Sequence, residues 1–179
     1  VSRALPNYRG HYQPHVPADL GFYDLSNPET LKRQAALAAR YGIGGFCHYF
    51  YWFTGGRRSL EKPLEPLLQS TASDFPFCLC WANENWTRTW DGQERDVLLA
   101  QTYEPGDAED SIAAMEPYLT QPNYIRINGK PLVLIYRPGL LPDAKAWAEA
   151  WRKHCREAGV GEIYLAFVES LEKAGGKTD

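Results

Sequence analysis

The sequence predicts an α/β fold that is part of a (β/α)8 barrel, and three observations lead to this prediction. Helical and strand-like patterns alternate along the 179 residues. The expected strands are continuous apolar runs, as in parallel sheets that are covered by helices. Polar and aromatic residues crowd the C-terminal ends of these strands, where barrel enzymes build their sites. A doubly wound parallel sheet is the competing architecture, because it shows the same alternation.

The first part of the chain predicts an irregular segment, a helix and a strand. Residues 1–25 contain prolines, few aliphatic residues and no sustained period, so we expect them to run irregularly over the surface. A helix is expected over residues 28–41, because Asn27 can cap its start, apolar residues recur at helical spacing, and Gly42 can end it. The aromatic and apolar run at 44–52 predicts a strand that is buried on both faces.

The rest of the chain repeats this alternation. We expect helices over residues 61–70, 107–119 and 143–158, and strands over 77–81, 124–127, 132–137 and 163–168. A long polar loop follows the strand at 77–81, and Asn128-Gly129 predicts a hairpin turn before a core strand. Four core strands are visible, although a barrel has eight. We therefore expect one incomplete domain over residues 1–170 that self-associates through open sheet edges, and a flexible tail over 171–179.

Composition limits the partners of this chain. It is 44% hydrophobic and has a formal net charge of -3, without the basic stripe that nucleic acid binding needs. Its longest apolar runs are of strand length, well short of the roughly 20 residues that span a bilayer. Residues 1–10 carry no apolar signal-peptide core. We therefore expect a soluble, cytoplasmic domain that binds no nucleic acid and does not insert into a membrane.

The cysteines and histidines raise two metal-site alternatives. All four cysteines lie inside apolar segments and not at the loop spacings of a disulfide framework. Strand alternation places Cys78 and Cys80 on one face, so a metal site that includes Cys47 is an alternative to reduced core thiols. His11 and His15 are a second alternative, but the proline between them prevents a shared helical face. We favour core thiols and loop packing, and expect no metal and no cofactor.

The densest set of functional side chains follows the strand at 77–81. Its Trp rings can stack on the apolar faces of sugar rings, while its amide, carboxylate and guanidinium groups can bond hydroxyls. Strand alternation points Glu84 into this site, and pairing of Glu84 with Arg88 is the alternative. The residues of this segment that we expect to contact substrate are Trp81, Asn83, Glu84, Asn85, Trp86, Arg88, Trp90 and Asp91.

Side chains at the ends of other strands extend this site. His48 is either a proton-transfer or hydrogen-bonding partner of the sugar, or a core residue. Glycoside cleavage needs two carboxyl groups across the scissile bond, and the candidate pairs are Glu84 with Glu169 and Glu84 with Asp91. The further residues expected to contact substrate are His48, Tyr49, Tyr51, Trp52, Tyr136 and Arg137.

Several motifs resemble one protein family. They are His-Tyr-Gln-Pro-His at residues 11–15 with the segment 17–24, the aromatic run at 41–53, Trp-Ala-Asn-Glu-Asn-Trp-Thr at 81–87, Gly-Lys-Pro-Leu at 129–132 and Tyr-Arg-Pro at 136–138. These motifs resemble the WbsX-type domain, which is labelled a glycosyltransferase and is similar to glycoside hydrolase family 99, the endo-α-mannosidase family. The resemblance covers nearly all of residues 8–170. It implies a (β/α)8 barrel that acts on glycans of bacterial surface polysaccharides, such as lipopolysaccharide O-antigen.

The resemblance also implies a missing catalytic part. Proteins of this family carry their paired carboxylates in a late Asn-Glu-Trp-x-Glu motif, which this sequence lacks. Two interpretations therefore stay open. The chain is a glycan-processing domain with transferase or hydrolase-like chemistry, or it is a non-catalytic carbohydrate-binding or scaffold fragment.

Overall fold

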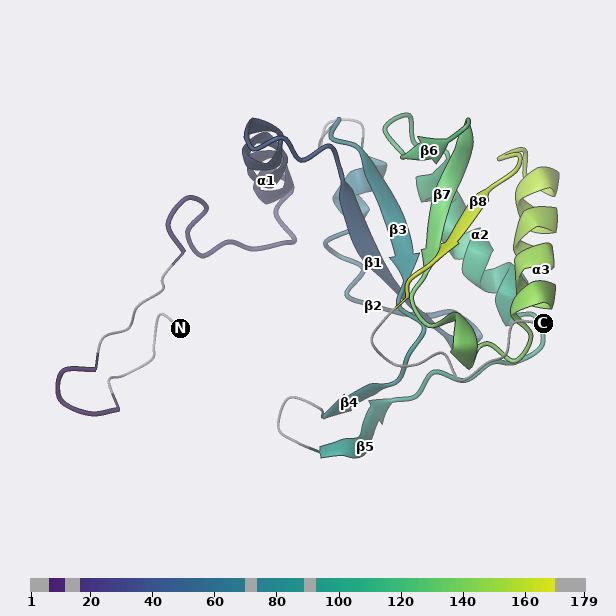
Figure 1. Cartoon of the computed structure of the whole chain (residues 1–179), viewed down its shortest axis with the longest axis horizontal. Coiled ribbons are helices and arrows are strands. Elements are labelled where there is room, and N and C mark those ends of the chain that lie inside the picture. The colour runs from purple at the N-terminus through teal and green to yellow at the C-terminus, as the bar shows by residue number, and fades with distance from the viewer. Residues whose placement is uncertain (1–6, 12–16, 70–73, 89–92, 170–179) are drawn as a thin grey trace.

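A sheet with four parallel strands forms the centre of the molecule (Figure 1). The structure is a computed structural model that describes residues 7–11, 17–69, 74–88 and 93–169. The parallel strands follow one another across the sheet in their order along the chain. They are β1 (Phe46–Phe53), β3 (Phe77–Trp81), β7 (Lys130–Ile135) and β8 (Tyr164–Phe167).

In the described residues three α-helices accompany the sheet, namely α1 (Pro28–Arg40), α2 (Asp107–Leu119) and α3 (Ala144–Glu157). Helices α2 and α3 pack on one face of the sheet (Figure 1), and Leu31 of α1 contacts the same core. In a doubly wound sheet the strand order reverses and helices cover both faces. In the described part of the chain the strand order does not reverse. The chain therefore has a mixed α/β architecture wound in one direction.

The boundaries of α1 confirm the predicted cap and stop. The Asn27 side chain accepts a hydrogen bond from the Glu29 backbone N–H, and Gly42 follows α1 with a φ of 77°. Asp143 likewise caps α3 by accepting a 2.9 Å hydrogen bond from the Ala146 backbone N–H. These side chains satisfy N–H groups that a helix start leaves without an internal partner.

Two predicted segments differ from the structure. The helix expected over residues 61–70 is only a short 3-10 turn, η2 (Glu65–Leu68), because Pro63 and Pro66 lack the N–H groups that an α-helix needs. The polar loop expected after β3 contains an antiparallel pair, β4 (Trp86–Arg88) and β5 (Gln93–Leu99). The tail expected over 171–179 lies outside the described residues.

Two short strands extend the parallel sheet. After the 3-10 turn η1 (Thr54–Gly56), β2 (Arg57–Ser59) pairs antiparallel with the end of β1. Strand β6 (Arg126–Ile127) pairs antiparallel with β7, which confirms the predicted hairpin. Its turn residues Asn128 and Gly129 have φ values of 50° and 79°, the positive angles that a type I′ turn requires.

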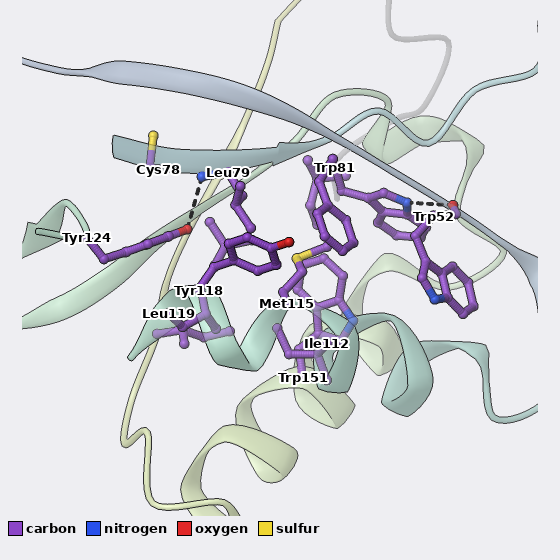
Figure 2. Packing of buried hydrophobic residues seen from close by; sticks show 14 of the residues in the cluster. Trp52, Cys78, Leu79, Trp81, Ile112, Met115, Tyr118, Leu119, Tyr124 and Trp151 are labelled. Atoms are coloured by element: carbon purple, nitrogen blue, oxygen red, sulfur yellow. Dashed lines mark hydrogen bonds between the residues drawn. The ribbon is translucent and has the colours of Figure 1, made fainter. Parts of the chain in front are cut away.

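The hydrophobic core lies between the sheet and helices α2 and α3 (Figure 2). The Trp81 ring is fully buried and stacks on the Trp147 ring at a centroid distance of 5.5 Å. The Tyr124 hydroxyl donates to the Leu132 carbonyl at 2.7 Å and accepts from the Leu79 N–H at 3.0 Å. Tyr124 therefore ties β3 to β7 from within the core. No helix in the described residues has the length and apolar character needed to cross a membrane.

Gly45 allows the close approach of two chain segments at the start of the sheet. A Cβ at this position would lie 2.8 Å from the Pro76 carbonyl oxygen and 3.0 Å from Ile125 Cδ1. We therefore expect Gly45→Ala to lower the free energy of unfolding by about 1–3 kcal/mol, as overpacking does. Urea unfolding measures this change. The neighbouring Gly44→Ala is the control, because a Cβ there meets nothing within 4 Å, and equal losses in both variants would contradict the prediction.

Candidate functional site

Aromatic side chains gather at the C-terminal end of the parallel sheet, on the face opposite to the helices. Tyr49 contacts Tyr136 edge-to-face at a centroid distance of 5.6 Å, and Tyr51 contacts Trp86 in the same way at 5.1 Å. The two pairs join where the Tyr49 and Tyr51 rings lie 6.1 Å apart. Tyr49 is 49% exposed, and the other three rings are half-buried. We call Tyr49, Tyr51, Trp86 and Tyr136 the aromatic cluster.

Backbone alternation explains why these tyrosines face outward. Phe50 and Trp52 of β1 point into the core, so Tyr49 and Tyr51 project from the other face of the same strand. Burial raises the pKa of Tyr51, and the nearby Glu84 carboxylate adds to this increase. Burial and the neighbouring Tyr136 raise the pKa of Tyr49 as well. Both hydroxyls therefore stay protonated at neutral pH and can donate hydrogen bonds.

An ion pair borders the aromatic cluster. The Glu84 carboxylate lies 3.1 Å from Nε of Arg137, and the Arg137 guanidinium lies over the Tyr136 ring at 4.7 Å from its centroid. The alternative that Glu84 pairs with Arg88 is not what the structure shows, since Arg88 lies 3.5 Å from Asp96. Side chains from β1, from β4 and from the segments that follow β3 and β7 thus bring charge and aromatic surface together.

Asn83 holds the strand ends beneath this ion pair. Its amide nitrogen donates to the Arg137 carbonyl at 2.8 Å, and its amide oxygen accepts from the Arg137 N–H at 2.8 Å. The same nitrogen also donates to the Tyr103 hydroxyl at 3.2 Å. Asn83 is fully buried, so it positions Arg137 and does not offer its amide to a ligand. Tyr103 was not identified from the sequence, because only the fold brings it to Asn83.

Three residues expected to contact a sugar lie on the helix side of the sheet instead. Trp52 and Trp81 are fully buried in the core, and Trp81 Nε1 donates to the Trp52 carbonyl. His48 lies against the edges of Phe46 and Phe77, where burial lowers its pKa and keeps the ring neutral. Its Nε2 is buried and has no hydrogen-bond partner in the described part of the chain. These positions follow from strand alternation, which points the residues away from the aromatic cluster.

The remaining candidates are distributed around the same end of the sheet. Asn85 is exposed and accepts a 2.6 Å hydrogen bond from the Gln101 N–H. Glu169 is exposed and follows β8. Strand β7 lies between β8 and β3, so about two strand spacings, roughly 10 Å, separate the end of β8 from the end of β3, after which Glu84 lies. Trp90 and Asp91 lie outside the described residues.

Other features of the surface do not provide a comparable set of groups. A cavity of about 560 Å³ lies between α1 and the start of β1, lined mainly by apolar side chains. We place the site at the aromatic cluster and not at this cavity, because the cluster combines accessible rings with the Glu84–Arg137 ion pair. Within these residues no group of three or more His, Cys, Asp or Glu side chains could hold a metal ion.

Comparison with known proteins identifies the family. A family model described as "Glycosyltransferase WbsX" matches residues 1–178. The chain belongs to the WbsX glycosyltransferase family. This WbsX membership and the fold together support a glycan-related domain.

Relatives of this WbsX domain are longer proteins. Two proteins named "Uncharacterized protein WxcX", from two strains of Xanthomonas campestris pv. campestris, are 49% identical to it over 173 residues. The match covers 97% of the chain but 25% of each relative, so the chain spans about a quarter of their length. A solved "Glycoside hydrolase-like protein" shares the fold with a TM-score of 0.57 and 19% identity. That similarity covers 83% of this chain and 45% of the solved one.

Proposed function

We propose that this chain is a glycan-processing domain of bacterial surface polysaccharide metabolism, such as that of lipopolysaccharide O-antigen, and that it acts in the cytoplasm. The observation that carries this proposal is the aromatic cluster beside the Glu84–Arg137 ion pair, at the C-terminal strand ends. Aromatic faces bind the apolar faces of sugar rings, and charged groups bond hydroxyls. Membership of the WbsX family supports the same substrate class.

We further propose that the domain is part of a (β/α)8 barrel related to glycoside hydrolase family 99. Support comes from the parallel strands, which follow one another in chain order, and from helices packed on one face. A barrel is built in this way, with its active site at the C-terminal strand ends. The strand ends that carry the aromatic cluster would then lie at the C-terminal face of the barrel.

A second candidate function is carbohydrate binding without catalysis. The ion pair favours it, because Arg137 already engages the Glu84 carboxylate at 3.1 Å, whereas a general acid or base has to exchange a proton with the substrate. In this case the cluster recognises the glycan, and the carboxylates for chemistry lie elsewhere in the longer protein. The residues proposed to contact the sugar are then Tyr49, Tyr51, Glu84, Asn85, Trp86, Arg88, Tyr136 and Arg137, with Trp90 and Asp91 as further candidates.

Both candidate functions require the chain to bind glycan, and calorimetry measures this binding. We expect bacterial surface glycans or α-mannosides to bind the chain, and Tyr51→Ala to weaken binding about tenfold, or roughly 1.4 kcal/mol, through the lost ring contact. Tyr41→Ala is the matched control, since Tyr41 is 72% exposed beside α1, away from the cluster. Equal weakening in both variants, or no binding by the unchanged chain, would contradict the proposal.

Hydrolysis and transfer assays on the same glycans separate the two candidates. Turnover by the unchanged chain that is lost in Glu84→Gln, with binding retained, supports glycan processing and gives Glu84 a catalytic role. Binding without turnover in either chain supports carbohydrate binding alone. Glutamine keeps the size of the side chain and removes its charge, so the comparison isolates the carboxylate.

The open sheet edges motivate a proposal about association. In the described residues β8 pairs only with β7, and the first half of β1 pairs only with β3. Unpaired strand edges are templates for pairing with another chain. We propose that two copies associate through these edges, and light scattering on the eluting protein should give twice the 20.3 kDa mass of one chain. A mass of one chain at high concentration would argue against this pairing.

A further inference from the structure

Three cysteines form a cluster on the open face of the sheet. Cys47 of β1 lies directly opposite Cys78 of β3 in the parallel register, and alternation places Cys80 on the same face. Figure 2 shows the Cys78 sulfur on the side of β3 away from the helices. We call Cys47, Cys78 and Cys80 the thiol cluster. Neither the proposed glycan function nor the core packing uses the Cys47 sulfur.

The three thiols differ in exposure and acidity. Cys47 is exposed, whereas Cys78 and Cys80 are 4% and 2% exposed. A hydrogen bond from the Cys78 thiol, and to a smaller extent one from the Cys80 thiol, lowers the pKa of Cys47 to about 3. The same hydrogen bonds raise the pKa values of Cys78 and Cys80, and burial adds to the increase. The accessible sulfur is therefore the one held as a thiolate, which is the nucleophilic form of cysteine.

We propose that Cys47 is an oxidation site that reacts with hydroperoxides and then forms a disulfide with Cys78. The Cys47 thiolate attacks the terminal oxygen of the hydroperoxide, the O–O bond breaks, and the departing alkoxide takes a proton from water to become an alcohol. Cys47 is now a sulfenic acid. The Cys78 sulfur attacks the Cys47 sulfur, the S–O bond breaks, and hydroxide leaves with the Cys78 proton as water. Two thiols lose two electrons, and the hydroperoxide gains them.

The sheet geometry allows this bond. Neighbouring strands lie about 4.8 Å apart, and disulfides join residues whose Cα atoms are about 4.4–6.8 Å apart. Direct register makes Cys78 the nearer partner, while Cys80 is diagonal to Cys47. Metal binding does not compete, because the cluster is not among groups that could hold a metal ion in the described residues. Cys155 lies in α3 within the core, on the other side of the sheet.

Peptide mapping after treatment with one equivalent of hydrogen peroxide tests this site. We expect two of the four thiols to be lost, and a tryptic peptide containing Cys47 to be linked to the peptide that contains Cys78 and Cys80. Cys47→Ala and Cys78→Ala should each abolish the link. Cys80→Ala should keep it, and the control Cys155→Ala should behave like the unchanged chain. A link that persists in Cys78→Ala, or one that joins two chains, would overturn the assignment.

Alkylation of the unchanged chain provides a measurement that does not depend on how the variants fold. Iodoacetamide should label Cys47 before the other cysteines, at a rate that changes less than twofold between pH 5 and 8. The titratable groups that act on the Cys47 sulfur are Cys78 and Cys80, which share its face of the sheet, and His48, whose ring lies on the other face of β1. An ordinary thiol reacts about tenfold faster for each pH unit below its pKa of about 8.5. A tenfold increase in the alkylation rate of Cys47 for each pH unit would overturn the proposal.

Discussion

Trp81→Ala should lower the free energy of unfolding by about 3–5 kcal/mol, the loss expected when a buried tryptophan leaves a cavity in a core. The Trp81 ring is fully buried and lies 5.5 Å from the ring centroids of both Trp147 and Trp151. Its removal also breaks the hydrogen bond from Nε1 to the Trp52 carbonyl. Chemical denaturation followed by circular dichroism measures the change.

Trp86→Ala is the matched control for Trp81→Ala. Trp86 is half-buried and belongs to the aromatic cluster, so its loss should cost about 1 kcal/mol of stability and should weaken glycan binding. A Trp81→Ala chain as stable as the unchanged chain, with weaker glycan binding, would instead make Trp81 a sugar platform. That outcome would reverse the roles assigned to the two rings.

Asn83→Ala should lower the free energy of unfolding by about 2–4 kcal/mol. The change removes three side-chain hydrogen bonds and leaves the Arg137 N–H and carbonyl without their partner. Each buried polar group left without a partner costs about 1–3 kcal/mol. Because Arg137 would lose its anchor, we also expect the variant to bind glycan at least as weakly as Tyr51→Ala. Urea unfolding and calorimetry measure the two effects.

Asn85→Ala tests whether the loss of stability in Asn83→Ala comes from removing the buried Asn83 amide. Asn85 is exposed, and its side chain accepts one hydrogen bond within the described residues, from the Gln101 N–H, so its loss should cost less than about 1 kcal/mol. Similar losses of stability in Asn83→Ala and Asn85→Ala would contradict the role of Asn83 as the link between β3 and β7.

Local signals made most of the fold predictable. Asn27, Gly42 and Asp143 act within a few residues of themselves, so the ends of α1 and the start of α3 could be located without knowing their neighbours. The helix predicted over 61–70 is absent for a local reason as well, because Pro63 and Pro66 oppose the α-helix that the apolar spacing favours. The β4–β5 pair was missed because the sequence of β5, Gln-Glu-Arg-Asp-Val-Leu-Leu, does not alternate between polar and apolar residues.

The sequence predicts where the aromatic cluster lies but only partly which residues form it. Aromatic and polar residues at strand ends predict that they meet at one end of the sheet, where the structure places the cluster. The face to which each ring points could not be deduced, since β1 and β3 are apolar at successive positions and a shift of one residue exchanges the faces. Tyr49 and Tyr51 were therefore grouped with Trp52 and Trp81. The Asn83 link depends on a partner 54 residues away, for which the sequence carries no signal.

Nuclear magnetic resonance of the tryptophan indoles tests the central claim, that the aromatic cluster is the sugar site. The chain has six tryptophans, and labelling with 15N gives each indole N–H its own signal, which single Trp→Phe variants assign. Titration with a glycan that binds should move the Trp86 signal in proportion to occupancy. The signals of the buried Trp52, Trp81 and Trp151 should change little. A Trp86 signal that stays in place while the glycan binds would contradict the account.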